Sequence, residues 1–354
     1  MSITILGDFY LGSTEDVDRY YKLEQSILKK AFATDFVVVN LEGSLPVGSS
    51  AKVGPKLALD RRVFDLLRYL GVDAVNLANN HANDHGASGL RATVLEAERC
   101  GLQVFGVFCD ELSNRAQLTI GDFRIISMAD TEFGVSSWRK CTPVPFSFEY
   151  LVSAISEAKA EGKAPVVVLH DGLEYSEIPT PELRSICRAI TGLGVAAVIC
   201  QHSHVVGVYE VHNESFIFYG SGNCIFEYAG RDHPSWQRGL AITVGEGSPP
   251  RGATYSTADL EVCRADYFED YSLIDRFDDQ SYEKYWAEEF AKRENSYASL
   301  LNTMFFNRLF HAFDRRVGLS RLLVSHNKGF AIKTNIIRSR VHREVISFLW
   351  GGRK

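Results

Sequence analysis

The stretch VNLANNHANDHG, residues 75–86, holds four asparagines, two histidines and an aspartate within and just after a run with the character of a buried strand. Asn, Asp and Gly are ordinary turn residues, so the stretch alone permits a plain loop. The same side chains bind metals and transfer protons. The rest of the chain decides between these two interpretations.

The bulk composition is that of an ordinary globular protein. The chain has 354 residues, 45% of them hydrophobic, and a formal net charge of −6. This charge lies in no long single-sign block over most of the chain, so we expect no nucleic-acid partner. The N-terminus does not resemble a secretory signal and no apolar run reaches the roughly 20 residues of a membrane span, which predicts a cytoplasmic protein.

The cysteines favour a reducing compartment. There are seven of them, an odd number, and none forms a CxxC pair. A disulfide framework is therefore not expected, and most of the thiols are predicted to be small buried hydrophobic side chains.

Short β-branched runs alternate with amphipathic stretches through the first two-thirds of the chain. Strands are predicted at residues 3–7, 36–40, 74–78, 104–107, 166–170 and 196–200. Helices are predicted at residues 20–32, 62–70, 90–100, 147–160 and 181–190. Hairpin turns are expected at 121–122 and 213–214. The predicted fold is a layered α/β sandwich whose sheets mix parallel units with hairpins.

Composition changes near Gly245, which predicts a domain of residues 1–245. The sequence GEGSPPRGATYS, 245–256, is interpreted as a linker to a mainly helical extension, 246–354. Its last stretch, 335–354, has one apolar face and many basic residues. Such a helix packs on its own domain in the common case, and peripheral contact with an anionic membrane or an acidic protein is the alternative.

Polar side chains end five of the predicted strands. In an α/β sheet, ligands gather beyond the carboxyl ends of the strands. The residues at these ends are Asp8, Glu42, Asn80 with His81, His170, and His202 with His204. Each alone is compatible with a cap, a turn or a buried histidine. Their regular alternation with strands is not expected of unrelated turn residues, and the set of oxygen and imidazole donors suits one or two ions of Mn, Fe, Zn or Mg.

The motifs GDFYLG, NLEG, ANNHANDHG, LHDGLEY, HSHV and GSGN, taken in order, resemble the CapA family of bacterial capsule or poly-γ-glutamate synthesis proteins, within the calcineurin-like metallophosphatase superfamily. The resemblance covers roughly residues 3–228. It implies a metallophosphatase fold. The metal ligands that it implies are Asp8, Glu42, Asn80, His170, His202 and His204, with Glu42 bridging two ions.

The resemblance also implies roles beside the metals. His81 becomes the catalytic acid/base or charge-stabilising residue, and Asp84 its partner. Asp171, Glu174 and Asn223 are expected near the substrate, while Asn79, Asn83 and His85 are interpreted as turn residues.

Two departures from the family pattern affect the metal site. Tyr10 stands where the superfamily has a metal-binding histidine, and a packed aromatic ring is a better interpretation than a phenolate ligand. Ser203 replaces a proline between His202 and His204, which predicts a more flexible ligand loop.

Three hypotheses for function follow. The first is a metal-dependent hydrolase or transferase that acts on a phosphoester, or on a peptide, isopeptide or glycan-linked group, in capsule or exopolymer biosynthesis. The second is a metal-assisted Cα epimerase of a peptide, with His81 and Glu174 as paired bases. The third is a non-catalytic binding or assembly factor of a surface-polymer machine. The substrate is accordingly a small molecule, a peptide or a polymer.

Overall fold

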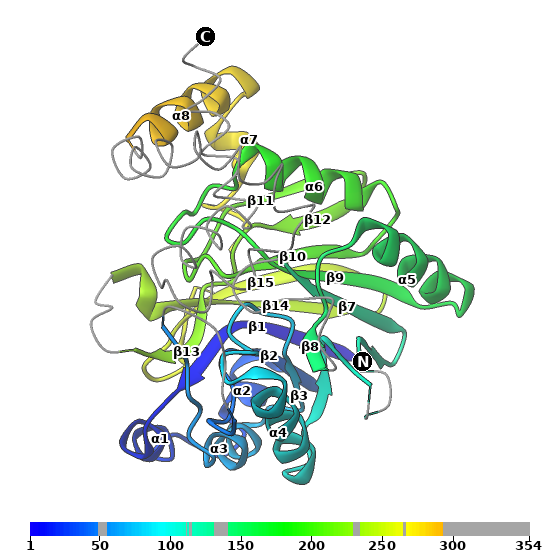
Figure 1. Cartoon of the computed structure of the whole chain (residues 1–354). Helices are drawn as coiled ribbons and strands as arrows, with labels where there is room; N and C mark the ends of the chain where they lie inside the picture. The colour runs from blue at the N-terminus through cyan, green and yellow to red at the C-terminus, as the bar shows by residue number, and fades with distance from the viewer. Residues whose placement is uncertain are drawn as a thin grey trace, which may run out of the picture.

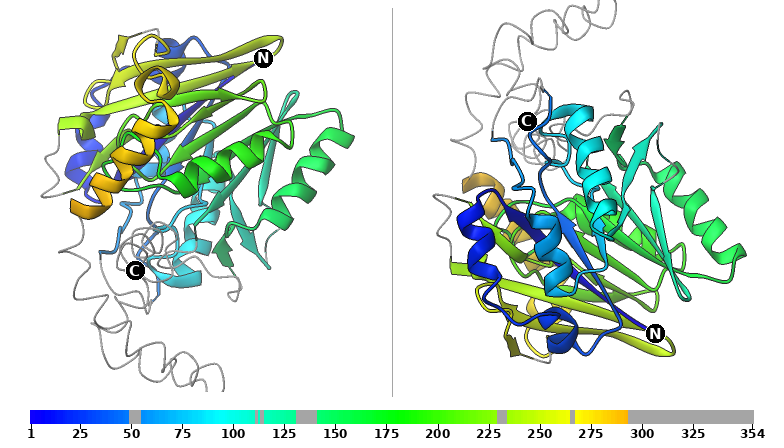
Figure 2. Two further views of the ribbon diagram at one scale, coloured as in Figure 1. Left: turned by 90° about the horizontal axis from the view of Figure 1, so that it is seen from above. Right: turned by 90° about the horizontal axis from the view of Figure 1, so that it is seen from below.

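Four layers build the part of the chain that is described in this computed structural model: residues 1–48, 55–110, 112, 115–130, 141–228, 234–264 and 267–292. Two mixed sheets face each other, and helices cover the outer face of each (Figures 1 and 2). The helices are α1 (Thr14–Tyr20), α2 (Ile27–Phe32), α3 (Val63–Leu70), α4 (Gly86–Arg99), α5 (Phe148–Ala160), α6 (Pro181–Thr191), α7 (Leu273–Arg276), α8 (Asp279–Lys292) and the 3-10 helix η1 (Pro234–Gln237).

The larger sheet has, from edge to edge, β16 (Val262–Arg264), β15 (Ser248–Ser256), β14 (Arg238–Gly245), β1 (Ser2–Leu11), β2 (Phe36–Leu41), β3 (Ala74–Asn76) and β4 (Gln103–Phe105), with β13 (Asn223–Glu227) also paired to β1. The smaller sheet has β11 (Tyr209–His212), β12 (Ser215–Phe218), β10 (Ala197–Gln201), β9 (Ala164–His170), β7 (Phe123–Ala129) and β6 (Gln117–Ile120). A separate pair joins β5 (Val107–Cys109) to β8 (Cys141–Pro143). Both sheets contain parallel and antiparallel pairs, as predicted.

Three apolar cores correspond to the three interfaces between these layers. One lies between α1–α4 and the larger sheet and contains Phe64 and Leu90. A second lies between the two sheets, where Ile5 and Val168 are buried. The third, which includes Trp286 of α8, lies between the smaller sheet and α5, α6 and α8. The predicted layered α/β sandwich is confirmed by this arrangement.

The six predicted strands and both predicted hairpin turns are present, but one predicted helix is not continuous. Residues 20–32 divide into the end of α1 and the separate helix α2. The chain turns at Ser26, whose φ is 57° and whose backbone N–H donates to the carbonyl of Tyr69, 2.8 Å away. A tertiary contact with α3 thus ends a helix that the apolar pattern alone predicts to continue.

The predicted linker at residues 245–256 is wrong. Most of it forms β15, which pairs with β14 on one side and β16 on the other. Pro249 and Pro250 fall where the register between β14 and β15 shifts, so they remove no regular ladder hydrogen bond. The first sheet therefore continues past the predicted boundary at residue 245, and the basic stretch 335–354 lies outside the described residues.

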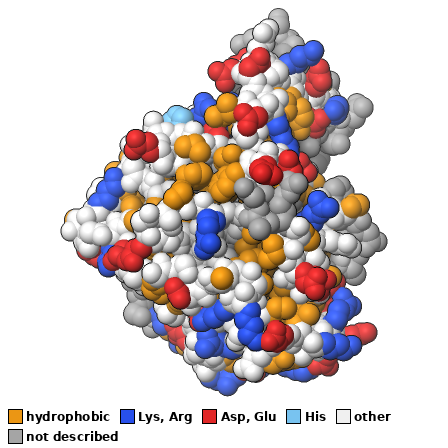
Figure 3. Space-filling view, turned by 180° about the vertical axis from the view of Figure 1, so that it is seen from behind, with side chains coloured by type: hydrophobic (Ala, Val, Ile, Leu, Met, Phe, Trp, Pro, Cys, Tyr) orange, Lys and Arg blue, Asp and Glu red, His pale blue; other side chains and the backbone are white. Residues whose placement is uncertain are grey.

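The expectation that the chain has no disulfide is also wrong, because Cys109 and Cys141 are bonded and join β5 to β8. Among the other described cysteines, Cys187, Cys200 and Cys224 are buried, as predicted. None of the helices in the described ranges is long and apolar enough to cross a bilayer. Acidic and basic side chains are interspersed over the described part of the face in Figure 3.

A buried ion network ties α6 to the β11–β12 hairpin. The side chain of Glu210 is fully buried and lies 2.9 Å from Arg188 and 3.3 Å from Arg184. The hydroxyl of Tyr219 donates to the same carboxylate at 2.5 Å. Burial raises the pKa of Glu210, but the hydrogen bonds from Arg188 and Tyr219 and the charge of Arg184 outweigh it and leave the pKa below its usual value.

Glu210→Gln is expected to lower the free energy of unfolding at pH 7 by about 3 kcal/mol, because two guanidinium groups lose their buried partner. A carboxyl whose pKa is depressed in the folded state stabilises above its unfolded pKa, and this stability is lost as the pH falls through the folded pKa. Urea unfolding at pH 7 and at low pH should therefore show a difference between variant and wild type that shrinks in acid.

Glu214→Gln, in the turn of the same hairpin, is the matched control. This side chain is exposed, so its loss should change stability by less than about 0.5 kcal/mol. An equal effect of the two substitutions would contradict the role of the network.

Candidate metal centre

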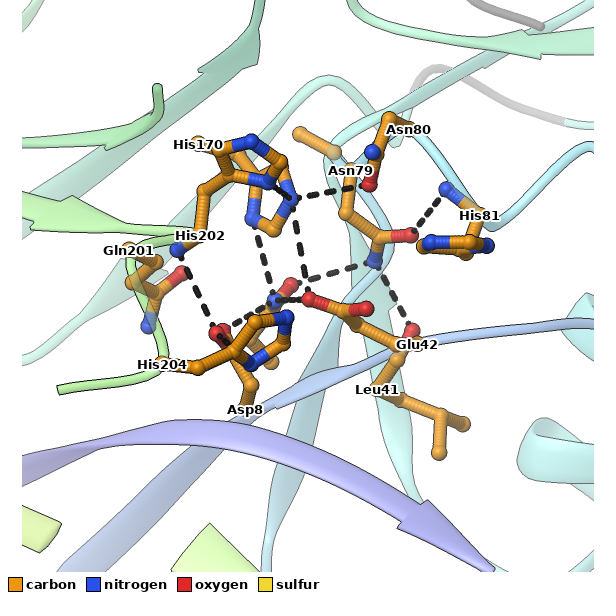
Figure 4. Close-up of polar contacts among 12 residues, drawn as sticks. Asp8, Leu41, Glu42, Asn79, Asn80, His81, His170, Gln201, His202 and His204 are labelled. Carbon is orange, nitrogen blue, oxygen red and sulfur yellow. Dashed lines mark hydrogen bonds and ion pairs between the residues drawn. The ribbon is translucent and has the colours of Figure 1, made fainter. Parts of the chain in front are cut away.

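The strand-end side chains meet where the carboxyl ends of the two sheets come together (Figure 4). The larger sheet supplies Asp8 near the end of β1, Glu42 directly after β2, and Asn80 in the loop after β3. The smaller sheet supplies the three histidines: His170 is the last residue of β9, and His202 and His204 follow β10. The six predicted ligands are thus brought into one cluster, and all are buried.

One half of the cluster gathers around His170. Its Nε2 lies 3.0 Å from Asn80 Oδ1, 3.2 Å from His202 Nδ1 and 3.6 Å from Glu42 Oε1. An amide oxygen, a carboxylate and two imidazoles therefore surround one point. This is a donor set that first-row divalent metals accept.

The other half gathers around Asp8. Its Oδ2 lies 3.2 Å from His204 Nδ1 and accepts a hydrogen bond from the His202 backbone N–H, also at 3.2 Å. The pairing register of β1 shifts beside Asp8, where the strand exchanges β14 for β13 as its neighbour. A Cβ on Gly7 would collide with the Gly222 carbonyl oxygen, so this exchange requires glycine.

Glu42 lies between the two halves and has one unused oxygen. Its side chain is fully buried, and its Oε2 has no hydrogen-bond partner among the described residues. Burial, followed by the charge of Asp8, raises the pKa of Glu42 well above its usual value. Asp8, Glu42 and His170 each offer a ligand atom within 4.8 Å of the others. A buried carboxylate oxygen without a partner fits a metal ligand, so the residues present fit a divalent ion.

The histidines differ in charge. Burial, together with the neighbouring His202 and His204, holds the pKa of His170 well below its usual value, and the neutral ring is the form that binds metals. Burial would also lower the pKa of His204, but the hydrogen bond to Asp8 and the charge of Glu42 raise it to about 9. Without a metal, a proton on His204 offsets part of the carboxylate charge.

The two histidines after β10 do not lie on an extended segment, as their predicted alternation requires. His202 has φ 96° and His204 has φ 58°, both in the left-handed region that non-glycine residues rarely adopt. A tight turn, not strand alternation, brings both rings to the cluster. Backbone strain of this kind is concentrated at functional sites.

Asn40, which the sequence reasoning passed over, organises the cluster. Its side-chain oxygen accepts hydrogen bonds from Asn76 and Asn79, at 3.4 and 3.1 Å. Its Nδ2 therefore faces Asp8 Oδ1 at 2.7 Å and His170 Nδ1 at 3.3 Å. Asn79 is thus part of the site and not a simple turn residue. The available signal was a fully buried asparagine at the end of an otherwise apolar strand.

His81 and Asp84 form a pair beside the cluster. His81 Nδ1 lies 2.8 Å from Asp84 Oδ2, which also accepts the backbone N–H of Leu57 at 2.7 Å. The aspartate is fully buried, whereas 18% of the His81 side chain is exposed. Because a carboxylate accepts at Nδ1, that nitrogen carries the proton and Nε2 is the free end of the ring. His85 instead pairs with Ser44 Oγ, as a loop residue would.

The remaining predicted residues fall into different places. Glu174 is exposed, and its charge acts on Glu42 and His204, so it lies near the cluster. Asp171 is buried, and its backbone N–H donates to the Gln201 carbonyl. Asn223 is fully buried and bonded at both ends of its amide, to His204 Nδ1 and the Trp236 carbonyl, which leaves no side-chain group for the predicted substrate contact.

Tyr10 packs as an aromatic ring. Its centroid lies 5.3 Å from that of Phe226, and its hydroxyl donates to the Ala58 carbonyl at 3.3 Å. The phenol is therefore directed to the backbone and not to a metal.

The four layers and the carboxylate, amide and imidazole cluster at the strand ends define the class of this protein, a metallophosphatase-like α/β sandwich. The family model described as bacterial capsule synthesis protein PGA_cap matches residues 2–228. The chain belongs to this family.

Two curated relatives come from Bacillus. The PGA biosynthesis protein CapA of Bacillus subtilis (strain 168) is 26% identical over 244 residues, which cover 64% of this chain and 63% of the relative. The capsule biosynthesis protein CapA of Bacillus anthracis is 26% identical over 250 residues, 64% of this chain and 60% of the relative. The chain thus spans less than two-thirds of the length of either relative.

Among solved structures, a hypothetical protein from Thermus thermophilus is similar to 72% of this chain over 99% of its own. Its sequence is 19% identical and the TM-score is 0.44.

Proposed function

We propose that the chain is a metal-dependent hydrolase or transferase that acts on a phosphoester, or on a peptide, isopeptide or glycan-linked group, in the synthesis of a capsule-like polymer. The observation that carries the proposal is the buried Glu42 Oε2, without a described hydrogen-bond partner, among six oxygen and imidazole donors. The printed names of the two Bacillus relatives support the place in capsule or PGA biosynthesis.

The residues divide into two groups with a shared carboxylate. Asp8 and His204 would hold one ion, Asn80, His170 and His202 the other, and Glu42 both. Bound metal supplies a polarised substrate oxygen and a water whose pKa is lowered toward neutrality.

The protein's own contribution is to orient these ligands and to move a proton. Asn40 holds Asp8 and His170 in register, so the ligands do not have to reorganise when substrate binds. The Nδ1 proton of His81 is held by Asp84, which directs Nε2 outward. A protonated Nε2 donates to the leaving-group oxygen or nitrogen, or stabilises charge that develops on the substrate.

The test uses purified full-length wild type and His202→Ala. Elemental analysis, followed by loading with Mn²⁺, Zn²⁺, Fe²⁺ or Mg²⁺, measures the metal content. Phosphodiester, phosphomonoester and γ-glutamyl peptide substrates then identify the bond that is cleaved. Stoichiometric metal and turnover of one class, both reduced in His202→Ala, are expected.

Absence of bound metal under all loading conditions would refute the proposal. It would favour a binding or assembly role for the chain. Metal-dependent inversion of a peptide Cα without bond cleavage would instead identify an epimerase.

A further inference from the structure

The ring of His204 is held from two sides by η1 and β13. Its centroid lies 4.5 Å from that of Trp236 and 4.9 Å from that of Phe226, which meets it nearly edge-on. Phe226 and Trp236 also contact each other at 5.2 Å, and the Trp236 indole N–H donates to the Phe226 carbonyl. The imidazole therefore sits in an aromatic corner whose two walls are fixed to each other.

A hydrogen-bond chain from the same tryptophan reaches the ring edge. The carbonyl of Trp236 can only accept, so the Asn223 side chain that meets it at 3.1 Å presents its NH₂ group. The amide oxygen of Asn223 then faces His204 Nδ1, at 2.9 Å. The backbone carbonyl at Trp236 thus decides which end of the Asn223 amide the histidine meets.

Both neighbours of His204 Nδ1 are acceptors. One is the Asn223 amide oxygen, and the other is Asp8 Oδ2 at 3.2 Å. A nitrogen between two acceptors carries the proton, which leaves Nε2 as the nitrogen with a lone pair for a metal. Since His204 has φ 58°, its backbone alone does not favour this placement, and outside contacts have to maintain it.

We propose that Trp236 and Asn223 are positioning residues that clamp His204 in one orientation, with Nδ1 as hydrogen-bond donor and Nε2 as its metal-binding nitrogen. This inference rests on the proposed metal-dependent function. It assigns to Asn223 a role in holding a ligand, and to Trp236 a role that no motif in the sequence indicates.

The first experiment measures Mn²⁺ affinity by titration calorimetry in the full chain. Asn223→Ala and Trp236→Leu should each weaken binding about 10–100-fold, the usual cost of losing the partner that orients a metal ligand. Asn223→Asp keeps an acceptor opposite Nδ1 and should recover most of the affinity. Glu210→Gln is the control: it lowers stability far from the site and should leave Mn²⁺ affinity unchanged.

The second experiment needs no variant. Nitrogen-15 NMR of the histidines in the Zn²⁺-loaded wild type should show His204 with a proton on Nδ1 and the metal on Nε2. Metal on Nδ1, or Mn²⁺ affinity that is the same in wild type, Asn223→Ala and Trp236→Leu, would overturn the clamp alone. A wild type that takes up neither ion would overturn the clamp together with the proposed function.

Discussion

Glu42→Gln is expected to abolish metal binding while leaving the metal-free protein about as stable as the wild type. Glu42 is the residue shared by both halves of the cluster, so its loss affects both ions. In the metal-free protein, the substitution replaces a buried carboxylate oxygen that lacks a described partner with an amide that can donate to neighbouring acceptors. The same change thus removes a ligand and relieves an unsatisfied buried group.

Thermal unfolding with and without MnCl₂ separates the two effects. A ligand present at 100 times its dissociation constant stabilises the folded state by about 2.7 kcal/mol, so wild type should melt at a clearly higher temperature with Mn²⁺. Glu42→Gln should melt at the wild-type metal-free temperature under both conditions. Glu210→Gln should do the reverse, with a lower melting temperature and an intact response to Mn²⁺. A full Mn²⁺ response in Glu42→Gln would contradict the bridging role.

The meeting of the six strand-end residues could be predicted because it depends on topology. Parallel strands place their carboxyl ends at one edge of a sheet, and two such edges meet here. The network within the cluster could not be predicted in the same way. Whether Asn40 faces Asp8 depends on the orientation of its amide, which Asn76 and Asn79 set through hydrogen bonds from neighbouring loops and strands.

The errors in the predicted fold also arise from contacts between distant segments. The break between α1 and α2 follows from the hydrogen bond of Ser26 to Tyr69, which lies on another helix. The strand β15 contains two prolines and a glycine and has the composition of a linker, yet β14 and β16 pair with it on both sides. Local propensity is overridden in both places by tertiary pairing.

The role of Trp236 shows the same limit at the site. The short helix η1 is separated from every predicted motif, and its tryptophan reaches His204 only because β13 lies beside the β1 end that carries Asp8. Motif spacing indicates which residues bind a metal. The residues that orient those ligands are set by the fold.

His81→Ala is expected to lower kcat by about 10²–10⁴-fold without loss of metal, on whichever substrate class the wild type cleaves. The proton-transfer role depends on a ring that lies beside the ligand cluster and is bonded to Asp84 through Nδ1. Its partial exposure, against the burial of all six predicted ligands, fits contact with substrate and not with the ions. Elemental analysis of the variant, together with steady-state kinetics, measures both quantities.

Asp84→Asn and His85→Ala separate a role in proton transfer from a general disturbance of the loop. Asp84→Asn keeps the His81 ring but removes the carboxylate that fixes its tautomer, so kcat should fall while metal content stays constant. His85 lies in the same loop but pairs with Ser44, so its replacement should leave kcat close to wild type. If His81→Ala retained wild-type turnover, or if it lost its metal, the proton donor would have to be sought elsewhere, because His81 would then be either dispensable or a ligand.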